Sequence, residues 1–309
     1  MNPAAFIGAA AVCGALLIDR AWGEPPTWAH PVVWMGRYLG ALGPRLSTWA
    51  PAAAFAGGAL AWCCGAAMSA GLAFLAVRLL GRWSPVWTAI GLAILLKPLL
   101  AWRMLRDEVA SVESALQQSL PAGRARLQRL VSRDAGALDA GQVRESAIES
   151  LAENLNDSVV APLFWFALGG LPAAALYRFA NTADAMWGYR GRYEWAGKWS
   201  ARADDLMSWL PARLTALLLL VAARRALPVA RLRREARITP SPNGGWPMGV
   251  MALLLDVQLG KPGVYVLNAG GTACNGLHTA QALAWSGRAV AVAAGIASAA
   301  SLVAARAWA

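Results

Sequence analysis

The sequence predicts an all-α polytopic membrane protein with about four to six membrane-embedded helical segments, some of them re-entrant. Of its 309 residues, 58% are hydrophobic and only 15% are charged, whereas soluble domains carry roughly 25% charged residues. Long apolar runs hold this excess, and about 20 residues suffice to cross the hydrocarbon core of a bilayer. We expect residues 1–309 to form a single integral membrane domain whose polar helical loops build a site on the cytoplasmic side.

Six apolar runs define the expected membrane segments: Pro3–Ile18, Ala52–Val77, Pro85–Trp102, Ser158–Ala175, Trp209–Ala223 and Ala289–Ala305. The second run is long enough for a full span, whereas Lys97 and Pro98 interrupt the third. In the fourth run, a Gly-Gly-x-Pro break at 169–172 favours a re-entrant hairpin of two half-helices. The first run lacks a basic flank and a small-residue cleavage site, which favours a retained segment over a removed signal peptide.

The formal charge of +11 is compatible with nucleic acid, a membrane surface or an anionic substrate as partner. The apolar bulk favours the lipid bilayer and argues against nucleic acid. Six arginines between Arg224 and Arg237 predict a cytoplasmic loop. The four cysteines form no C-x-x-C pair and therefore predict neither a zinc site nor a disulfide framework.

Three polar segments separate the apolar runs. We expect a polar helical insertion over 103–157, a polar site segment over 177–208, and a Gly/Pro-rich cytoplasmic loop region over 238–286.

The first set of candidate site residues lies on the segment QVRESAIESLAENLND, which ends at Asp157. Helical periodicity places Glu145, Glu149 and Glu153 within one arc. Three carboxylates on one stripe repel each other unless cations lie between them. A solvated face balanced by nearby arginines is one interpretation, but Asp157 leads directly into an apolar run, where carboxylates are more often functional.

A second cluster follows the fourth apolar run. Asn181 and Asp184 are three residues apart, and the adjacent acids Asp204 and Asp205 precede Arg213. Carboxylates can hold Mg²⁺ with several waters in place, and arginines can clamp phosphate or carboxylate groups bidentately. A structural ion-pair network at a helix boundary is the alternative.

Two shorter clusters complete the set. Asp19, Glu24, His30 and Arg37 lie near the N-terminus, and S-P-N-G-G-W-P occupies 241–247. A histidine between Ala and Pro is more often a capped turn residue than a ligand or base. Glycines let a backbone approach a ligand closely. Neither G-x-x-x-x-G-K-[ST] nor G-x-G-x-x-G is present, so any nucleotide site is of another kind.

These clusters, in this order, resemble the CobD/CbiB family, the adenosylcobinamide-phosphate synthases of cobalamin biosynthesis. The first block is similar to the family pattern D-x-x-x-G-[DE]-P…H-P-V…G-R, with Asp19, Gly23, Glu24, Pro25, His30, Pro31, Val32, Gly36 and Arg37. Later matching blocks are Arg133-Asp134; Glu149…Glu153-Asn154…Asp157; Tyr177…Asn181-Thr182…Asp184…Tyr189; Arg192…Arg202…Asp204-Asp205…Arg213; and Ser241-Pro242-Asn243. The matches span about residues 19 to 265. The chain departs from the family pattern at Ser132 and Ser158 in place of Gly, Thr239 in place of His, and Met248 in place of Glu.

The resemblance implies an enzyme, a carbon–nitrogen ligase that joins adenosylcobyric acid to aminopropanol phosphate, or to aminopropanol, through an amide bond. ATP is then a substrate that converts the corrin propionate into an acyl phosphate, with Mg²⁺ as cofactor. A multi-pass protein of the cell inner membrane is implied, with its active site facing the cytoplasm and other late cobalamin-pathway membrane proteins as partners. A corrinoid-binding membrane carrier or scaffold without ligase activity is the alternative.

The resemblance also implies roles for individual residues. Catalytic roles fall to His30, Glu149, Glu153, Asp157, Asp184 and Asp205, with His30 or Glu149 taking the amine proton. Mg²⁺ would be held by Glu153, Asp157, Asp184, Asp204 and Asp205. Substrate binding would involve Asp19, Arg37, Arg133, Asp134, Asn154, Asn181, Tyr189, Arg192, Arg202, Arg213, Ser241 and Asn243.

Overall fold

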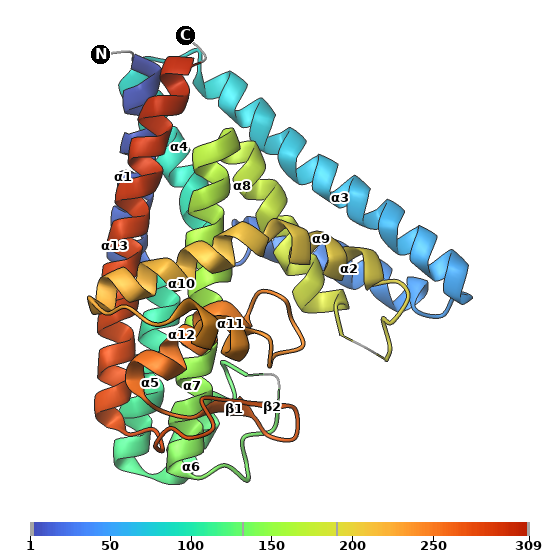
Figure 1. Ribbon diagram of the computed structural model, residues 1–309. Helices are drawn as coiled ribbons and strands as arrows, with labels where there is room; N and C mark the ends of the chain where they lie inside the picture. Colours follow the sequence, from blue (N-terminus) through green and yellow to red (C-terminus); the bar gives the residue numbers. More distant parts are fainter. Residues whose placement is uncertain (1–2, 132, 190, 308–309) are drawn as a thin grey trace. The chain divides into compact units, whose positions relative to one another are not determined.

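The computed structural model describes residues 3–131, 133–189 and 191–307, which are mostly helical (Figure 1). Ser132, which belongs to one of the family motifs, lies outside the described residues. The elements in chain order are α1 (Pro3–Trp22), α2 (Pro31–Leu46), α3 (Pro51–Leu80), α4 (Pro85–Leu96), the 3₁₀ turn η1 (Lys97–Leu99), α5 (Trp102–Gln118), α6 (Leu120–Leu127), α7 (Ala140–Leu155), the π-helical turn η2 (Asn156–Val160), α8 (Ala161–Trp187), α9 (Lys198–Met207), α10 (Trp209–Ala223), α11 (Val229–Ala236), α12 (Gly245–Leu255), β1 (Leu259–Lys261), β2 (Tyr265–Leu267) and α13 (Gly276–Ala307).

The predicted fold class is confirmed. Among the described residues, four helical stretches are long and apolar enough to cross a membrane, or five if α9 and α10 together form one span. The four stretches are Pro51–Leu80, Pro85–Gln118, Ala140–Trp187 and Gly276–Leu302. They include the second, third and fourth of the apolar runs that the sequence indicates and most of the last.

The chain divides into two compact units, and the prediction of a single integral membrane domain stays a prediction. Unit 1 comprises Met1–Ala101, Ala161–Ser208 and Ala294–Ala309, and unit 2 comprises Trp102–Val160 and Trp209–Ala293. Each unit therefore combines segments that are far apart in the sequence. Hydropathy could not reveal this division, because apolar and polar segments contribute to both units.

The core of unit 1 forms where α2, α3 and α8 pack together. Phe179 is fully buried, and a Cβ atom added at Gly65 of α3 would lie 2.2 Å from its ring. Glycine at this position therefore lets α3 and α8 approach closely. On its outer side α3 exposes large apolar side chains such as Leu60 and Phe74. A helix that is apolar all round, yet largely uncovered by protein, is typical of a lipid-facing span.

The break predicted in the fourth apolar run is confirmed within α8. Gly169 and Gly170 have non-helical backbone angles, and Gly170 has φ of 65°. Glycine adopts this left-handed conformation without the steric cost that a side chain would add. Figure 1 shows the chain turning back at the break, so α8 consists of two half-helices.

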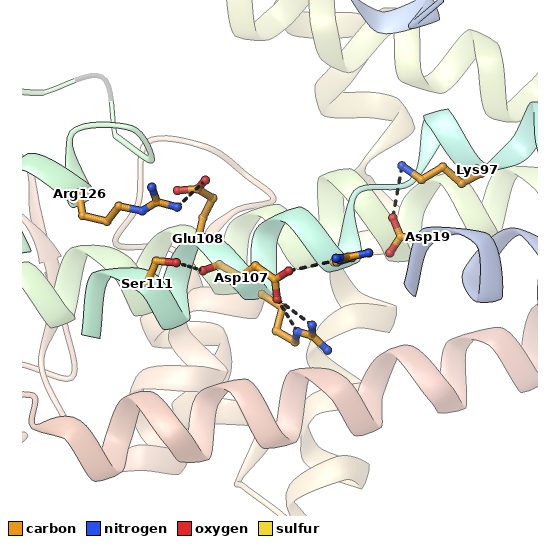
Figure 2. A network of polar contacts seen from close by, with 8 residues as sticks. Asp19, Lys97, Asp107, Glu108, Ser111 and Arg126 are labelled. Carbon is orange, nitrogen blue, oxygen red and sulfur yellow. Dashed lines mark hydrogen bonds and ion pairs between the residues drawn. The ribbon is translucent and has the colours of Figure 1, made fainter. Parts of the chain in front are cut away.

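Unit 2 is built around α7, which contacts α5, α6, α12 and β1. Its N-terminus is closed by a capping box in which Asp139 and Gln142 bond each other's backbone N–H groups. Elsewhere in this unit, Glu108 of α5 forms an ion pair with Arg126 of α6 at 2.9 Å (Figure 2). The strands β1 and β2 form an antiparallel hairpin in which Lys261 pairs with Tyr265.

The predicted loop region over 238–286 requires a correction, because α12 and the first turns of α13 lie inside it. Almost all of α12 is buried. Pro247 lies in its first turn, where proline is tolerated. A Cβ atom at Gly245 would lie 2.3 Å from the carbonyl oxygen of Ala236. The glycine thus serves close packing here, although in the sequence it suggested a loop.

Two candidate polar sites

The first candidate site, in unit 1, is a charged corner made of Asp19, Glu24, His30 and Lys97. Lys97 begins η1, at the end of an apolar helix, and its side chain is 3% exposed. Its Nζ lies 2.8 Å from Oε2 of Glu24. It also lies 3.4 Å from Oδ1 of Asp19, and Figure 2 draws this second ion pair. A buried ammonium requires such partners, because desolvation without pairing costs several kcal/mol.

His30 is the N-cap residue of α2. Its Nδ1 accepts a hydrogen bond from the backbone N–H of Val32 at 3.2 Å, so the ring proton is on Nε2. Nε2 lies 3.0 Å from Oε2 of Glu24 and donates to it. Both ring nitrogens are therefore engaged. The geometry matches a capped turn histidine that positions Glu24.

Glu24 has an unusual environment for a carboxylate. Burial raises its pKa, but the hydrogen bonds from His30 and Lys97 and the charge of Lys97 outweigh burial and leave the pKa below its ordinary value. His30 and Lys97 both contact Oε2. The other oxygen, Oε1, is buried and has no hydrogen-bond partner among the described residues. Nζ of Lys97 likewise lacks a hydrogen-bond partner there, so the charged corner contains a buried acceptor and a buried donor that are not bonded to the described residues.

The remaining unit 1 candidates lie on α2, α8, α9 and the segment between α8 and α9. The exposed members are Arg37, Tyr189, Arg192 and Arg202. Asn181 accepts a hydrogen bond from Arg178 on the same helix. On α9, Oδ2 of Asp204 accepts from Ser208 at 3.5 Å. Asp184 and Asp205 are both partly buried on helices of this unit.

The second candidate site, in unit 2, is built on the acid stripe of α7, which consists of Glu145, Glu149 and Glu153. The helix forms as predicted, but the stripe is not a fully solvated face, because Glu149 is buried. A Cβ atom at Gly260 of β1 would lie 3.3 Å from Oε1 of Glu145, and one at Gly244 would lie 3.4 Å from Oε1 of Glu153. Two backbone segments with glycine at the contact therefore cover part of the stripe.

Arg133 and Tyr265 hold Glu149 from two directions. Nη2 of Arg133 donates to Oε2 of Glu149 at 3.1 Å and to Oγ of Ser146 at 2.7 Å. The Tyr265 hydroxyl of β2 donates to Oε1 of Glu149. Burial and then the Glu149 charge raise the pKa of Tyr265, which keeps the hydroxyl protonated.

Two further nitrogens of Arg133, Nε and Nη1, are buried and lack hydrogen-bond partners among the described residues. Buried guanidinium groups normally have all their donors bonded. This side therefore offers unused donors next to the acid stripe, an arrangement suited to a carboxylate or phosphate oxygen.

Arg213, Ser241 and Asn243 are brought together as the sequence pattern suggested. The Arg213 guanidinium lies between the rings of Trp209 and Trp246, at 4.5 and 4.8 Å from their centroids. It donates to Oδ1 of Asn243 at 2.7 Å and to two backbone carbonyls. Ser241 Oγ accepts from the backbone N–H of Asn243. Arg213 therefore holds the S-P-N turn in place.

Other unit 2 candidates bond locally. Asn154 donates back to the carbonyl of Ser150 at 3.0 Å. Asp157 accepts from Asn156 at 2.8 Å. Asp134 is exposed and accepts from the backbone N–H of Gly136.

A magnesium site with several protein ligands is not assembled in the described part of the chain, where no three His, Cys, Asp or Glu side chains group together in a way that could hold a metal ion. Of the five candidate ligands, Glu153 and Asp157 belong to unit 2 and Asp184, Asp204 and Asp205 to unit 1. Mg²⁺ that arrives with substrate phosphates needs only one or two carboxylates. Glu153 and Asp157 of unit 2 are two carboxylates that suit this way of binding Mg²⁺.

Sequence reasoning missed two residues of these sites. Lys97 stood out only as an interruption of an apolar run, although an ionisable residue within a membrane segment is itself a functional signal. Tyr265 carried no signal, because its role depends on a contact with Glu149 across more than a hundred residues. Met248, the departure from the family's Glu, lies beside Tyr265, with Sδ 3.8 Å from the hydroxyl.

The fold and the two sites define a multi-span helical membrane protein whose two units each bury a charged cluster. The chain belongs to the family described as CobD/Cbib protein, whose model matches residues 12–294. It is 42% identical over 253 residues to a probable cobalamin biosynthesis protein CobD of Thermococcus kodakarensis, covering 81% of this chain and 82% of the relative. The cobalamin biosynthesis proteins CobD of Dehalococcoides mccartyi and Stutzerimonas stutzeri are 38% and 39% identical, and each alignment covers 82% of this chain. These alignments cover 84% and 82% of the two relatives, respectively. No solved structure matches the chain.

Proposed function

We propose that this chain is an ATP-dependent amide ligase of cobalamin biosynthesis, which joins adenosylcobyric acid to aminopropanol phosphate or aminopropanol. The names of its relatives support the pathway. The observation that carries the chemistry is the pair of unused buried nitrogens of Arg133 beside the acid stripe. A ligase of this kind must bind an oxyanion, either the substrate carboxylate or a phosphate, and a fixed guanidinium does so well.

The proposed reaction proceeds in two steps. A carboxylate oxygen of the corrin propionate attacks the terminal phosphorus of ATP, which forms an acyl phosphate and releases ADP. The amine nitrogen then attacks the acyl carbon, phosphate leaves with its bonding electrons, and the nitrogen gives up a proton. Arg133 would stabilise negative charge on the acyl or phosphoryl oxygens.

The acids of unit 2 take separate roles in this proposal. Glu153 and Asp157 would hold Mg²⁺ on the phosphates, where the ion would neutralise charge. Glu149 already accepts from Arg133 and Tyr265, so we assign it the positioning of Arg133. Glu145 would take the amine proton. Within unit 1 by itself, Asp184, Asp204 and Asp205 stay proposed metal ligands.

The test is amide formation by the purified, detergent-solubilised protein, with product detected by mass spectrometry. It would receive adenosylcobyric acid, aminopropanol phosphate, Mg²⁺ and ATP. We expect ATP-dependent product, and a loss of about 10²- to 10³-fold in Arg133→Ala, which removes an oxyanion donor. Arg129→Ala is the matched control, because this arginine is 63% exposed and has only a 3.6 Å ion pair.

A carrier for corrinoids is the second candidate, favoured by the buried charges of Lys97 and Asp19 beside a membrane segment. A carrier would bind corrinoid and form no amide. The same assay, combined with corrinoid binding, separates the two candidates. Under either function we propose an inner-membrane location, a cytoplasmic site and contact with other late-pathway membrane proteins.

A further inference from the structure

Unit 2 carries a group of arginines that the proposed ligation does not use. They lie between the end of α10 and the C-terminal end of α11, and we call them the arginine surface. All of them are exposed: Arg224, Arg225, Arg231, Arg233, Arg234 and Arg237. Arginines elsewhere in unit 2, such as Arg126 and Arg144, pair with acids instead. The arginine surface is therefore a candidate for binding an anion.

The acids of the protein do not neutralise the arginine surface. Glu235 is the single acid in this segment, and its Oε2 accepts a hydrogen bond from the backbone N–H of Asn268 at 2.8 Å. Arg225 and Arg231 donate to uncharged acceptors, which are the carbonyl oxygen of Leu254 and Oδ1 of Asn268. In the described part of the chain the six arginines form no ion pair with an acid, so their charge is left for a partner.

The fold of α11 explains why its arginines face outward. Leu232 and Ala236 are four residues apart, so they share one face of the helix, and both are buried. The helix packs on α12 (Figure 1). Arg233 and Arg234 follow Leu232 at helical steps of about 100° and lie away from this face. They form no hydrogen bond or ion pair with other described residues, so their donors are available to a ligand.

An apolar stripe on α10 adjoins the arginine surface. Leu210, Leu217 and Val221 lie on one face of this helix and are 55%, 56% and 52% exposed. The backbone N–H of Arg224 donates to the carbonyl oxygen of Val221 at 3.0 Å, so the first arginine follows the stripe directly. Exposed apolar side chains beside cationic groups match the two parts of an anionic lipid, its acyl chains and its headgroup.

We propose that the arginine surface and the apolar stripe bind an anionic phospholipid, with its phosphate on the guanidinium groups and its acyl chains along α10. A guanidinium group can bind a phosphate through two parallel N–H donors. Anionic lipids of the cytoplasmic leaflet attract basic segments next to membrane helices. A soluble phosphate compound would use the arginines but leave the stripe uncovered, so the stripe favours a lipid. This surface and its test do not depend on the proposed ligation.

Native mass spectrometry of the full chain in detergent tests this inference. Phosphatidylglycerol, which carries a net negative charge, would be added in competition with phosphatidylcholine of the same acyl chains, which is neutral overall. We expect about 20-fold preference for phosphatidylglycerol, because two arginines that share one headgroup contribute about fivefold each. Equal retention of the two lipids, or retention of neither, would overturn the proposal.

A double variant, Arg233→Gln with Arg234→Gln, locates the headgroup. It removes two exposed cations and breaks no contact with a described residue, so the ratio of the two retained lipids should fall by about fivefold or more. The matched control is Arg106→Gln with Arg129→Gln. It removes the same charge from exposed arginines of unit 2 that already pair with acids, and should leave the ratio unchanged. An equal fall in both double variants would show that only net charge matters and would refute the surface.

Two further results separate a lipid from a soluble phosphate compound. Leu217→Asn, in the middle of the stripe, should lower the retention of both lipids without changing their ratio, because it removes a contact with the acyl chains. ATP added to the lipid-bound protein should not displace phosphatidylglycerol. Displacement by ATP, or unchanged lipid retention in Leu217→Asn, would overturn the proposal and assign the arginines to a soluble anion.

Discussion

The charged corner of unit 1 and the acid stripe of unit 2 each pair a buried carboxylate with a cation, but the two cations differ. In the corner, the compact ammonium of Lys97 lies within ion-pair distance of two carboxylates, but Nζ of Lys97 and Oε1 of Glu24 both lack a hydrogen-bond partner among the described residues. On the stripe, the wider guanidinium of Arg133 bonds one carboxylate and keeps two nitrogens unused. Lysine is a point charge and arginine a planar fork of five donors, so the choice of cation affects which hydrogen-bonding atoms are left without partners. Among the described residues, the stripe keeps two buried donors of Arg133 without partners, whereas the corner keeps a donor of Lys97 and an acceptor of Glu24.

The largest expected effect comes from removing the cation of the corner. Lys97→Met leaves Asp19 and Glu24 buried without their ammonium, and we expect a loss of about 3–5 kcal/mol in the free energy of unfolding. Tryptophan fluorescence during denaturation in detergent would measure it. The control Lys198→Met changes a half-exposed lysine, whose removal should cost less than about 1 kcal/mol. Equal losses in the two variants would show that the corner is not a paired buried cluster.

A smaller effect is expected where the stripe loses a neutral donor. Tyr265→Phe removes the hydrogen bond to Glu149 but leaves Arg133 in place, at a cost of about 1.5–3 kcal/mol. The loss should appear as faster hydrogen exchange in β1 and β2. Tyr189→Phe, at an exposed tyrosine, serves as the control. Unchanged exchange in the hairpin would mean that Tyr265 does not hold it to the stripe.

The effect of pH on the stability that the charged corner contributes should be smaller still. The pKa of Glu24 is lowered in the folded state, so its pairing stabilises the protein above the ordinary value of 4.5. This contribution is lost as pH falls below that value, through the folded pKa. Melting temperature should therefore drop more in the parent protein than in Glu24→Gln between about pH 6 and pH 3.5. If the melting temperatures of the two proteins fall equally with pH, Glu24 does not contribute to stability as an ionised member of the charged corner.

Accessibility from the two sides of the membrane tests whether both regions serve one cytoplasmic reaction. Cysteines at the exposed positions Arg192 and Asp134, one in each unit, should react only from the cytoplasmic side. Burial and then the Glu145 charge raise the pKa of the native Cys274 thiol to about 12, so its labelling should be slow. The other native cysteines are exposed and would be replaced. Labelling of the two sites from opposite sides would rule out a shared reaction.

The sequence predicted much of the fold because its strongest signals are local. Apolar runs located the long helices, and the Gly-Gly-x-Pro pattern located the break in α8. The helix α12 was missed, because glycine and proline at its start serve packing and capping rather than a loop. The division into two units and the roles of Lys97 and Tyr265 depend on contacts between distant segments, which no local pattern encodes.

The departure at Met248 shows how a family difference can be absorbed. The thioether lies beside the Tyr265 hydroxyl, which bonds Glu149, and its methyl group lies next to Gly244 near Glu153. Two carboxylates of the stripe are thus adjacent to the position where the family usually has an acid. The local negative charge persists although that residue has changed.

The length of α3 has a consequence for the membrane around the protein. Its 30 residues extend about 45 Å, whereas the hydrocarbon core is about 30 Å thick. Trp49 and Trp83, both largely exposed, flank its two ends and would anchor them at the interfaces. A span of this length must tilt steeply, and a thicker bilayer would let it stand more upright. Because α3 packs against α2 and α8, hydrophobic mismatch would become a mechanical load on the core of unit 1, observable as a free energy of unfolding that varies with lipid chain length.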